Sequence, residues 1–273
     1  MGAQNNNHAK VYQASQPTYY GHGGASRSER EQLISRMYSC LPWELRHHIH
    51  TFCVQSSYDN EIIVRYGSKG KPMLLVRRSV GPGPYQWTED PIILQFGPDK
   101  IGPEASADLL TTYYGSRTFK FAHQELGCIQ SFLETDSSGL GIRPADHLRH
   151  LHLQIQPFMC VQIEEPELRR SEEARCCRAL ESLTALRAPR TTIAVHVDLT
   201  QGVSFEEEFG ELSDDAAAFV FRILEIVKNL RVTGLNIEVI LEGAWDERSG
   251  TKLCSSSTPS LDDCAMTMKI ASR

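Results

Sequence analysis

Three segments of the chain alternate apolar and polar residues, and this pattern dominates its second half. The segments read LRHLHLQI at 148–155, TTIAVHVDL at 191–199 and LNIEVIL at 235–241. A period of two is typical of β-strands with one buried face. Each segment follows a stretch of helical periodicity, at 123–133, 166–186 and 214–230. Equivalent positions recur every roughly 42–44 residues, a length typical of helix-plus-strand repeats, so we predict a mainly parallel sheet joined by right-handed crossovers.

The alternation also predicts what covers each face of this sheet. A parallel sheet with helices on both faces is apolar on both, whereas these strands are mostly polar at alternate positions. We therefore expect helices on one face only and an open polar face opposite, which is a natural partner-binding surface in α/β repeats. The candidate residues on this polar sheet face are His150, His152, Gln154, His196, Asp198 and Glu238.

Residues 57–245 are predicted to form one α/β domain, with the repeat-like units beginning at about residue 118. The segments EIIVR and MLLVR flank the sequence GSKGK, a pattern typical of a β-hairpin. The short apolar run at 91–96 fits either a strand or the start of a helix. The expected elements before the repeats are a hairpin over 61–65 and 73–77, a loop at 79–91, a helix at 104–114 and a strand at 118–121.

Two short helices are predicted at 28–56, and the second carries an apolar stripe. Ser28 and Glu31 form a capping-box pattern at the start of the first helix. The stripe is read in two ways, as a docking face or as a surface that packs on the preceding helix and the hairpin. We favour internal packing, because one helix cannot easily use a single stripe for both. The stripe consists of Leu41, Leu45, Ile49 and Phe52, and the candidate docking residues are Leu41, Pro42, Leu45 and Ile49. The histidines at 47, 48 and 50 are expected on the exposed polar side.

Composition limits the class of protein. A hydrophobic content of 41% and a charged content of 23% are typical of globular chains, and the net charge of −6 disfavours nucleic-acid binding. The chain contains no run near the ~20 apolar residues of a membrane span. Its eight cysteines form no CxxC pair, so we expect reduced thiols in a cytoplasmic or nuclear protein. The polar ends predict a disordered tail at 1–27 and a loose tail at 246–273, with a last strand at 265–270.

Three motifs occur in order along the chain: Leu-Pro-x-Glu-Leu-Arg-x-x-Ile at 41–49, Tyr-x-x-x-Thr-Phe-x-Phe at 114–121 and Leu-Arg-His-Leu-x-Leu at 148–153. In this order they resemble the F-box-like domains that are abundant in filamentous fungi. The resemblance covers a little under half of the chain. It departs from the family in two places. The predicted hairpin at 61–77 stands in place of further helices, and at 93–101 the stretch Leu-Leu-x-x-Cys-Arg-x-Ile is replaced by ILQFGPDKI.

The resemblance implies a protein–protein interaction module and no chemistry. Its partner would be a Skp-type ubiquitin-ligase adaptor, which would dock on Leu41, Pro42, Leu45 and Ile49. Recognition of a substrate would then fall to the α/β domain.

No motif of a known catalytic centre occurs in the sequence. The spacings G-x-S-x-G, H-E-x-x-H, G-x-G-x-x-G and finger-type Cys/His are all absent, so no catalytic residue and no cofactor are predicted. An alternative function uses the polar sheet face, where His152, His196 and Glu238 have the chemistry of metal ligands. A metal-binding protein or a hydrolase-type enzyme would require these side chains to converge around a cleft.

Overall fold

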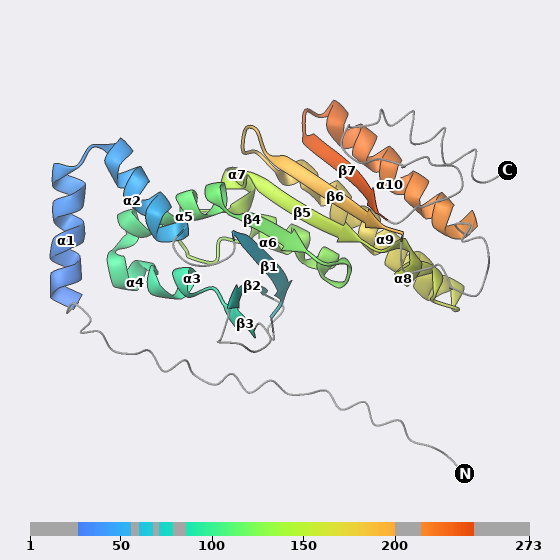
Figure 1. Ribbon diagram of the computed structural model, residues 1–273, viewed down its shortest axis with the longest axis horizontal. Helices are drawn as coiled ribbons and strands as arrows, with labels where there is room; N and C mark the ends of the chain where they lie inside the picture. Colours follow the sequence, from blue (N-terminus) through green and yellow to red (C-terminus); the bar gives the residue numbers. More distant parts are fainter. Residues whose placement is uncertain (1–26, 56–59, 68–70, 79–85, 200–213, 243–273) are drawn as a thin grey trace, which may run out of the picture.

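The computed structural model describes residues 27–55, 60–67, 71–78, 86–199 and 214–242 (Figure 1). The two predicted tails, apart from residue 27, and the predicted strand at 265–270 lie outside this part of the chain. The strands are β1 (Glu61–Tyr66), β2 (Pro72–Arg78), β3 (Gln86–Glu89), β4 (Thr118–Phe121), β5 (His150–Ile155), β6 (Thr192–Asp198) and β7 (Asn236–Glu242). The longer helices are α1 (Arg27–Cys40), α2 (Trp43–Gln55), α5 (Pro103–Ser116), α9 (Pro166–Glu181) and α10 (Asp214–Val232).

Shorter helices complete the connections between these elements. They are α3 (Pro91–Gln95), α4 (Pro98–Ile101), η1 (His123–Cys128), α6 (Ile129–Glu134), α7 (Pro144–His147), α8 (Pro157–Val161) and η2 (Ser182–Ala185). No helix within the described ranges is both long enough and apolar enough to cross a membrane.

All seven described strands form one mixed sheet with the order β3-β2-β1-β4-β5-β6-β7. The predicted hairpin is confirmed, because β1 and β2 pair antiparallel. The prediction of a loop at 79–91 is wrong at its end, where β3 pairs antiparallel with β2. Strand β3 is a short edge strand with mostly exposed side chains, and such a strand has no alternating apolar pattern by which it can be recognised.

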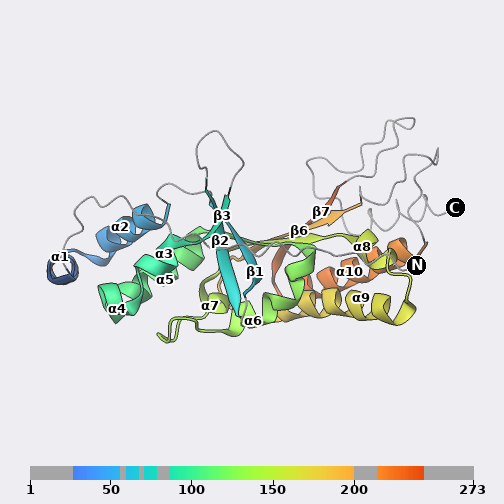
Figure 2. The same cartoon turned by 90° about the horizontal axis from the view of Figure 1, so that it is seen from below.

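The five strands from β1 through β4 to β7 run parallel, and the prediction of a parallel sheet with helices on one face is confirmed. Figure 2 shows α9 and α10 on the same side of the strands. The register places His150, Thr192 and Asn236 in one row across β5, β6 and β7. The sequence repeat is therefore a spatial repeat, with one strand and its preceding helical segment in each of the last three units.

The core lies between the sheet and these helices. Strand side chains that face the helices are buried, among them Leu151, Leu153, Val195 and Val197. An aromatic cluster joins α5, β4 and α6. The ring of Phe119 lies 5.7 Å from that of Tyr113 and 5.3 Å from that of Phe132, measured between centroids.

A buried carboxylate links this aromatic cluster to the start of α3. Oδ1 of Asp90 accepts a hydrogen bond from the backbone N–H of Ile92 at 2.9 Å, which caps the helix, and the hydroxyl of Tyr113 donates to Oδ2 at 2.8 Å. Burial and the neighbouring carboxylate hold the pKa of Tyr113 well above its ordinary value. The phenol therefore remains a hydrogen-bond donor throughout the physiological pH range, and the buried carboxylate is satisfied by two donors.

Helix α2 packs on α5 by the opposite face from the one expected. Leu45, Ile49 and Phe52 are 50%, 39% and 74% exposed, whereas His50 and Val54 are buried. The preference for internal packing of the apolar stripe is therefore wrong, and so is the expected exposure of His50. Helix α5 directs Leu109, Leu110 and Tyr113 into the core, so a more polar surface is left for α2.

We predict that Phe119→Ala lowers the free energy of unfolding by about 3–5 kcal/mol, because truncating a buried aromatic ring leaves a cavity. Urea denaturation followed by circular dichroism measures this change. Phe52→Ala on α2 is the control, and its effect should remain within about 0.5 kcal/mol because Phe52 is 74% exposed. Equal losses in the two variants would contradict the position assigned to the core.

Candidate functional site

The polar sheet face brings two of its predicted residues into direct contact. The imidazole rings of His152 on β5 and His196 on β6 lie 4.0 Å apart between centroids. Lys120 on β4 pairs in register with His152, and Ala194 separates His152 from Glu238 in the same row. The candidate residues therefore form a band across three strands, with the two histidines at its centre.

The remaining predicted residues of this face differ in exposure. His150 and Glu238 are exposed and Gln154 is half-buried. Asp198 is buried at the end of β6, where its Oδ2 accepts a hydrogen bond of 3.4 Å from the side chain of Gln156. Asp198 thus belongs to the carboxyl edge of the sheet, next to the start of α8.

His152 is held in its neutral form. Burial, together with the neighbouring His196 and Lys120, lowers the pKa of His152 to about 4. At neutral pH the ring of His152 therefore has one N–H donor and one nitrogen acceptor. This position of the sheet is suited to hydrogen bonding with a polar partner.

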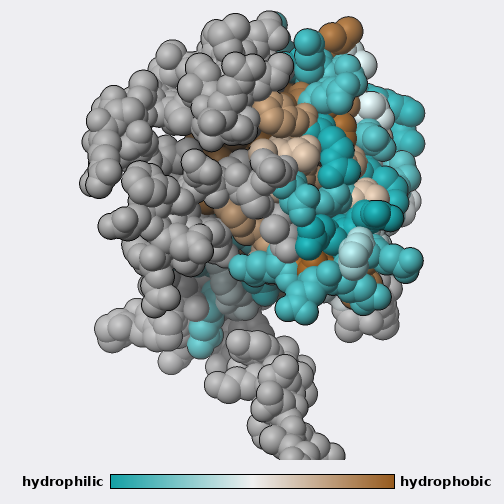
Figure 3. All heavy atoms as spheres, turned by 90° about the vertical axis from the view of Figure 1, so that its right-hand side faces the viewer, coloured by the Kyte–Doolittle hydropathy of each residue, from teal (hydrophilic) through white to brown (hydrophobic). Residues whose placement is uncertain are grey.

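A second candidate surface lies at the opposite end of the molecule from β7, on α1 and α2 (Figure 1). We call it the α2 apolar face, and it consists of Leu45, Ile49 and Phe52, with Trp43 and Leu33 exposed nearby. Leu41 is half-buried and Pro42 is exposed at the start of α2. Figure 3, which views the end formed by α8, α9 and α10, shows mainly hydrophilic described residues with smaller apolar areas between them.

Polar contacts fix the helices that present this face. The hydroxyl of Tyr38 on α1 donates to Oδ2 of Asp108 on α5 at 2.8 Å. The guanidinium of Arg46 lies 4.3 Å from the centre of the Tyr38 ring, a cation–π contact. Nδ1 of His47, which is itself exposed on α2, lies 3.4 Å from the hydroxyl of Thr112 on α5. The buried side of α2 is therefore specified by polar pairs, and the apolar stripe is left to face outward.

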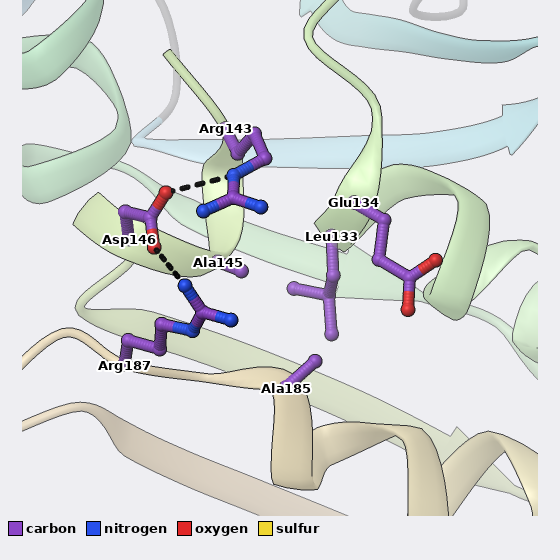
Figure 4. Close-up of a pocket in the computed structure, with 7 residues that line it drawn as sticks. All are labelled: Leu133, Glu134, Arg143, Ala145, Asp146, Ala185 and Arg187. Atoms are coloured by element: carbon purple, nitrogen blue, oxygen red, sulfur yellow. Dashed lines mark hydrogen bonds and ion pairs between the residues drawn. The ribbon is translucent and has the colours of Figure 1, made fainter. Parts of the chain in front are cut away.

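Two cavities among the described residues lie away from the polar sheet face. A groove of about 480 Å³ lies between α2, α5 and the segment before β6, lined in part by Trp43, His50, Asp108 and Arg149. A smaller cavity of about 230 Å³ is drawn in Figure 4, where Arg143 and Arg187 both point at the carboxylate of Asp146. Because one carboxylate faces both guanidinium groups, at 3.0 and 4.0 Å, neither arginine is an uncompensated site for an anion.

A third group of chemically interesting side chains lies in the interior, and sequence reasoning missed it. Among the described residues, His123, Cys160 and Cys176 form the group of three whose potential ligand atoms lie together. They are distant in sequence and lie on three different elements. The expectation of reduced thiols does not identify these two cysteines, because their convergence with His123 depends on how α8 and α9 fold back against η1.

No protein-family model matches the chain, and the comparisons with curated proteins and with solved structures also gave no match. The resemblance to F-box-like domains therefore remains a prediction from three motifs.

We predict that the ring of His152 titrates with a pKa of about 4 in the folded protein, which NMR of labelled histidine measures directly. The unfolded chain takes up this proton at about pH 6.5, so protonation favours unfolding as the pH falls from about 6.5 to about 4. Lys120→Met should raise the pKa of His152, because it removes a nearby positive charge.

Lys228→Met is the matched control, because Lys228 is exposed on α10 and lies away from this face. It should leave the titration of His152 unchanged. A midpoint near the ordinary histidine value in the wild-type protein would contradict the packing described for β5 and β6.

Proposed function

We propose that this protein is an interaction adaptor with two separate binding surfaces. The α2 apolar face docks one protein partner, and the polar sheet face contacts another. The observation that carries the proposal is the exposure of Leu45, Ile49 and Phe52 along one side of a helix whose other side is buried.

Exposed apolar surface on a folded protein is energetically unfavourable. Single exposed hydrophobic residues are common on proteins, whereas a contiguous group is typical of a binding site. Leu45 and Ile49 are one turn apart on α2, and Phe52 follows at the next turn. The spacing i, i+4 and i+7 is the one by which amphipathic helices present anchor residues to a partner.

The sequence resemblance to F-box-like domains suggests the kind of partner that the α2 apolar face would bind. In F-box-like domains the segment that corresponds to 41–49 docks on a Skp-type adaptor of a ubiquitin ligase, and here the same segment presents Pro42, Leu45 and Ile49 outward. The polar sheet face would then serve as the substrate-binding surface. Its contacting histidines, with Lys120 and Glu238 on the neighbouring strands, favour a partner with many hydrogen-bonding groups.

We predict that the double variant Leu45→Asp/Ile49→Asp loses affinity for a purified Skp-type adaptor by at least tenfold, about 1.4 kcal/mol. The reason is that a carboxylate at the centre of an apolar interface is buried without a partner. Isothermal titration calorimetry with purified components measures the affinity.

Leu168→Asp is the matched control, because Leu168 is a comparably exposed leucine on α9 at the other end of the molecule. It should bind the adaptor as the wild-type protein does. Because all three positions are exposed, every variant should unfold at nearly the wild-type urea concentration. Wild-type protein that does not bind the adaptor, or a double variant that binds equally well, would remove this function.

A further inference from the structure

A group of metal-ligating side chains lies at the carboxyl edge of the parallel strands, buried beneath α8 and α9. His123 opens η1 directly after β4, Cys160 lies on α8 directly after β5, and Cys176 lies on α9. One potential ligand atom from each residue lies within 4.8 Å of the other two. The three side chains are 2%, 0% and 0% exposed.

The two ring nitrogens of His123 have different neighbours. Its Nδ1 accepts a hydrogen bond of 3.1 Å from the backbone N–H of Gln156. Its Nε2 is buried and lies 3.3 Å from Oε1 of Glu172, as an ion-pair contact. Because Nδ1 is already occupied by a backbone donor, Nε2 is the ring nitrogen that can ligate a metal ion, and a carboxylate lies beside it.

The types of ligand atom in this group favour one kind of metal ion. Two cysteine sulfurs and one imidazole nitrogen are the ligands of Cys₂His zinc sites, and thiolates disfavour the hard cations Mg²⁺ and Ca²⁺. The charges also balance. Two thiolates neutralise a divalent cation, and Glu172 is already neutralised by its ion pair with Arg175. A zinc-loaded site therefore leaves no net charge in the interior, which is the condition for burying ions at low cost.

We propose that His123, Cys160 and Cys176 bind one Zn²⁺ ion. Tetrahedral zinc with Zn–S bonds of about 2.3 Å sets the two sulfurs about 3.8 Å apart, so the three ligands must close by up to about 1 Å. Glu172, whose side chain is 26% exposed, is the nearest group for the fourth position. This site is separate from the two surfaces of the proposed function and does not depend on them.

The position of the ring proton of His123 shows which segment must move when zinc binds. In the zinc-free arrangement Nδ1 accepts from Gln156, so the ring proton is on Nε2. Zinc binding at Nε2 moves that proton to Nδ1, and the two thiols release their protons to solvent. The N–H of Gln156 must then turn away from Nδ1. Gln156 is the N-cap of α8, the helix that carries Cys160, so one shift of this junction frees Nδ1 and closes the site.

The test is a metal titration of the full chain, purified without metal and kept reduced. Zinc measured after equilibrium dialysis should reach one ion per chain at micromolar free zinc, and Co²⁺ should give the absorption of cobalt–thiolate bonds. Because loss of even an outer-shell partner costs about 10–100-fold in affinity, Cys160→Ser and Cys176→Ser should each weaken binding by at least about 100-fold and abolish the cobalt–thiolate signal.

Cys128→Ser is the matched control, because Cys128 is another buried thiol whose Sγ donates to the carbonyl of Glu125, outside the site. It should bind zinc with wild-type stoichiometry. NMR of labelled histidine gives a second readout that does not need the variants to fold. The proton of His123 should be on Nε2 without zinc and on Nδ1 with it.

Two results would overturn the proposal. The first is wild-type protein that is folded and reduced but binds no stoichiometric zinc at micromolar concentration. The second is zinc binding that remains unchanged in both Cys160→Ser and Cys176→Ser while the histidine proton stays on Nε2.

Discussion

Within the described residues, the parallel sheet is covered by helices on one face, and the placement of the other elements follows from this arrangement. The strands from β1 through β4 to β7 follow chain order across the sheet. Because parallel crossovers are right-handed, a sheet built in one direction places every connecting helix on the same side. The aliphatic residues of β5 and β6 that face the helices are buried without exception, and the alternate positions are left for polar side chains.

This one-sided arrangement also determines where function can reside. Helix α5 directs its apolar residues to the sheet, and Asp108 and Thr112 remain on the side that meets α1 and α2. Helix α2 therefore packs by its polar side and exposes its apolar stripe. At the carboxyl edge of the strands, the same topology brings the residues after β4 and β5 together, which places His123 beside Cys160. Gln156 connects that interior group to Asp198 through its side chain.

The repeat strands could be predicted from the sequence because their register follows from a period of two, and a single slip would expose the apolar set. The pairing His150–Thr192–Asn236 is the direct result. Strand β3 could not be predicted, because its pairing comes from β2 and not from its own residues. The orientation of α2 could not be predicted either. The sequence shows the apolar stripe of α2. The side of α2 that packs, however, is determined by contacts among Tyr38, Arg46 and Asp108, which lie on three different helices.

The sequence likewise predicts one part of the candidate site and not the other. The polar sheet face follows from alternation, and the contact between His152 and His196 follows from register. The interior group does not, because a ligand set on η1, α8 and α9 exists only after the helices have folded onto the sheet. In each case the predictable part is local or repeats with a fixed period, and the remainder depends on contacts between elements distant in the chain.

We propose that the outward side of α2 is a docking surface, which hydrogen–deuterium exchange with and without a purified Skp-type adaptor can measure. We predict slower exchange over residues 43–55 when the adaptor is present and no change over 150–155 in the centre of the sheet. Unchanged exchange over 43–55, or protection confined to other elements, would contradict the claim.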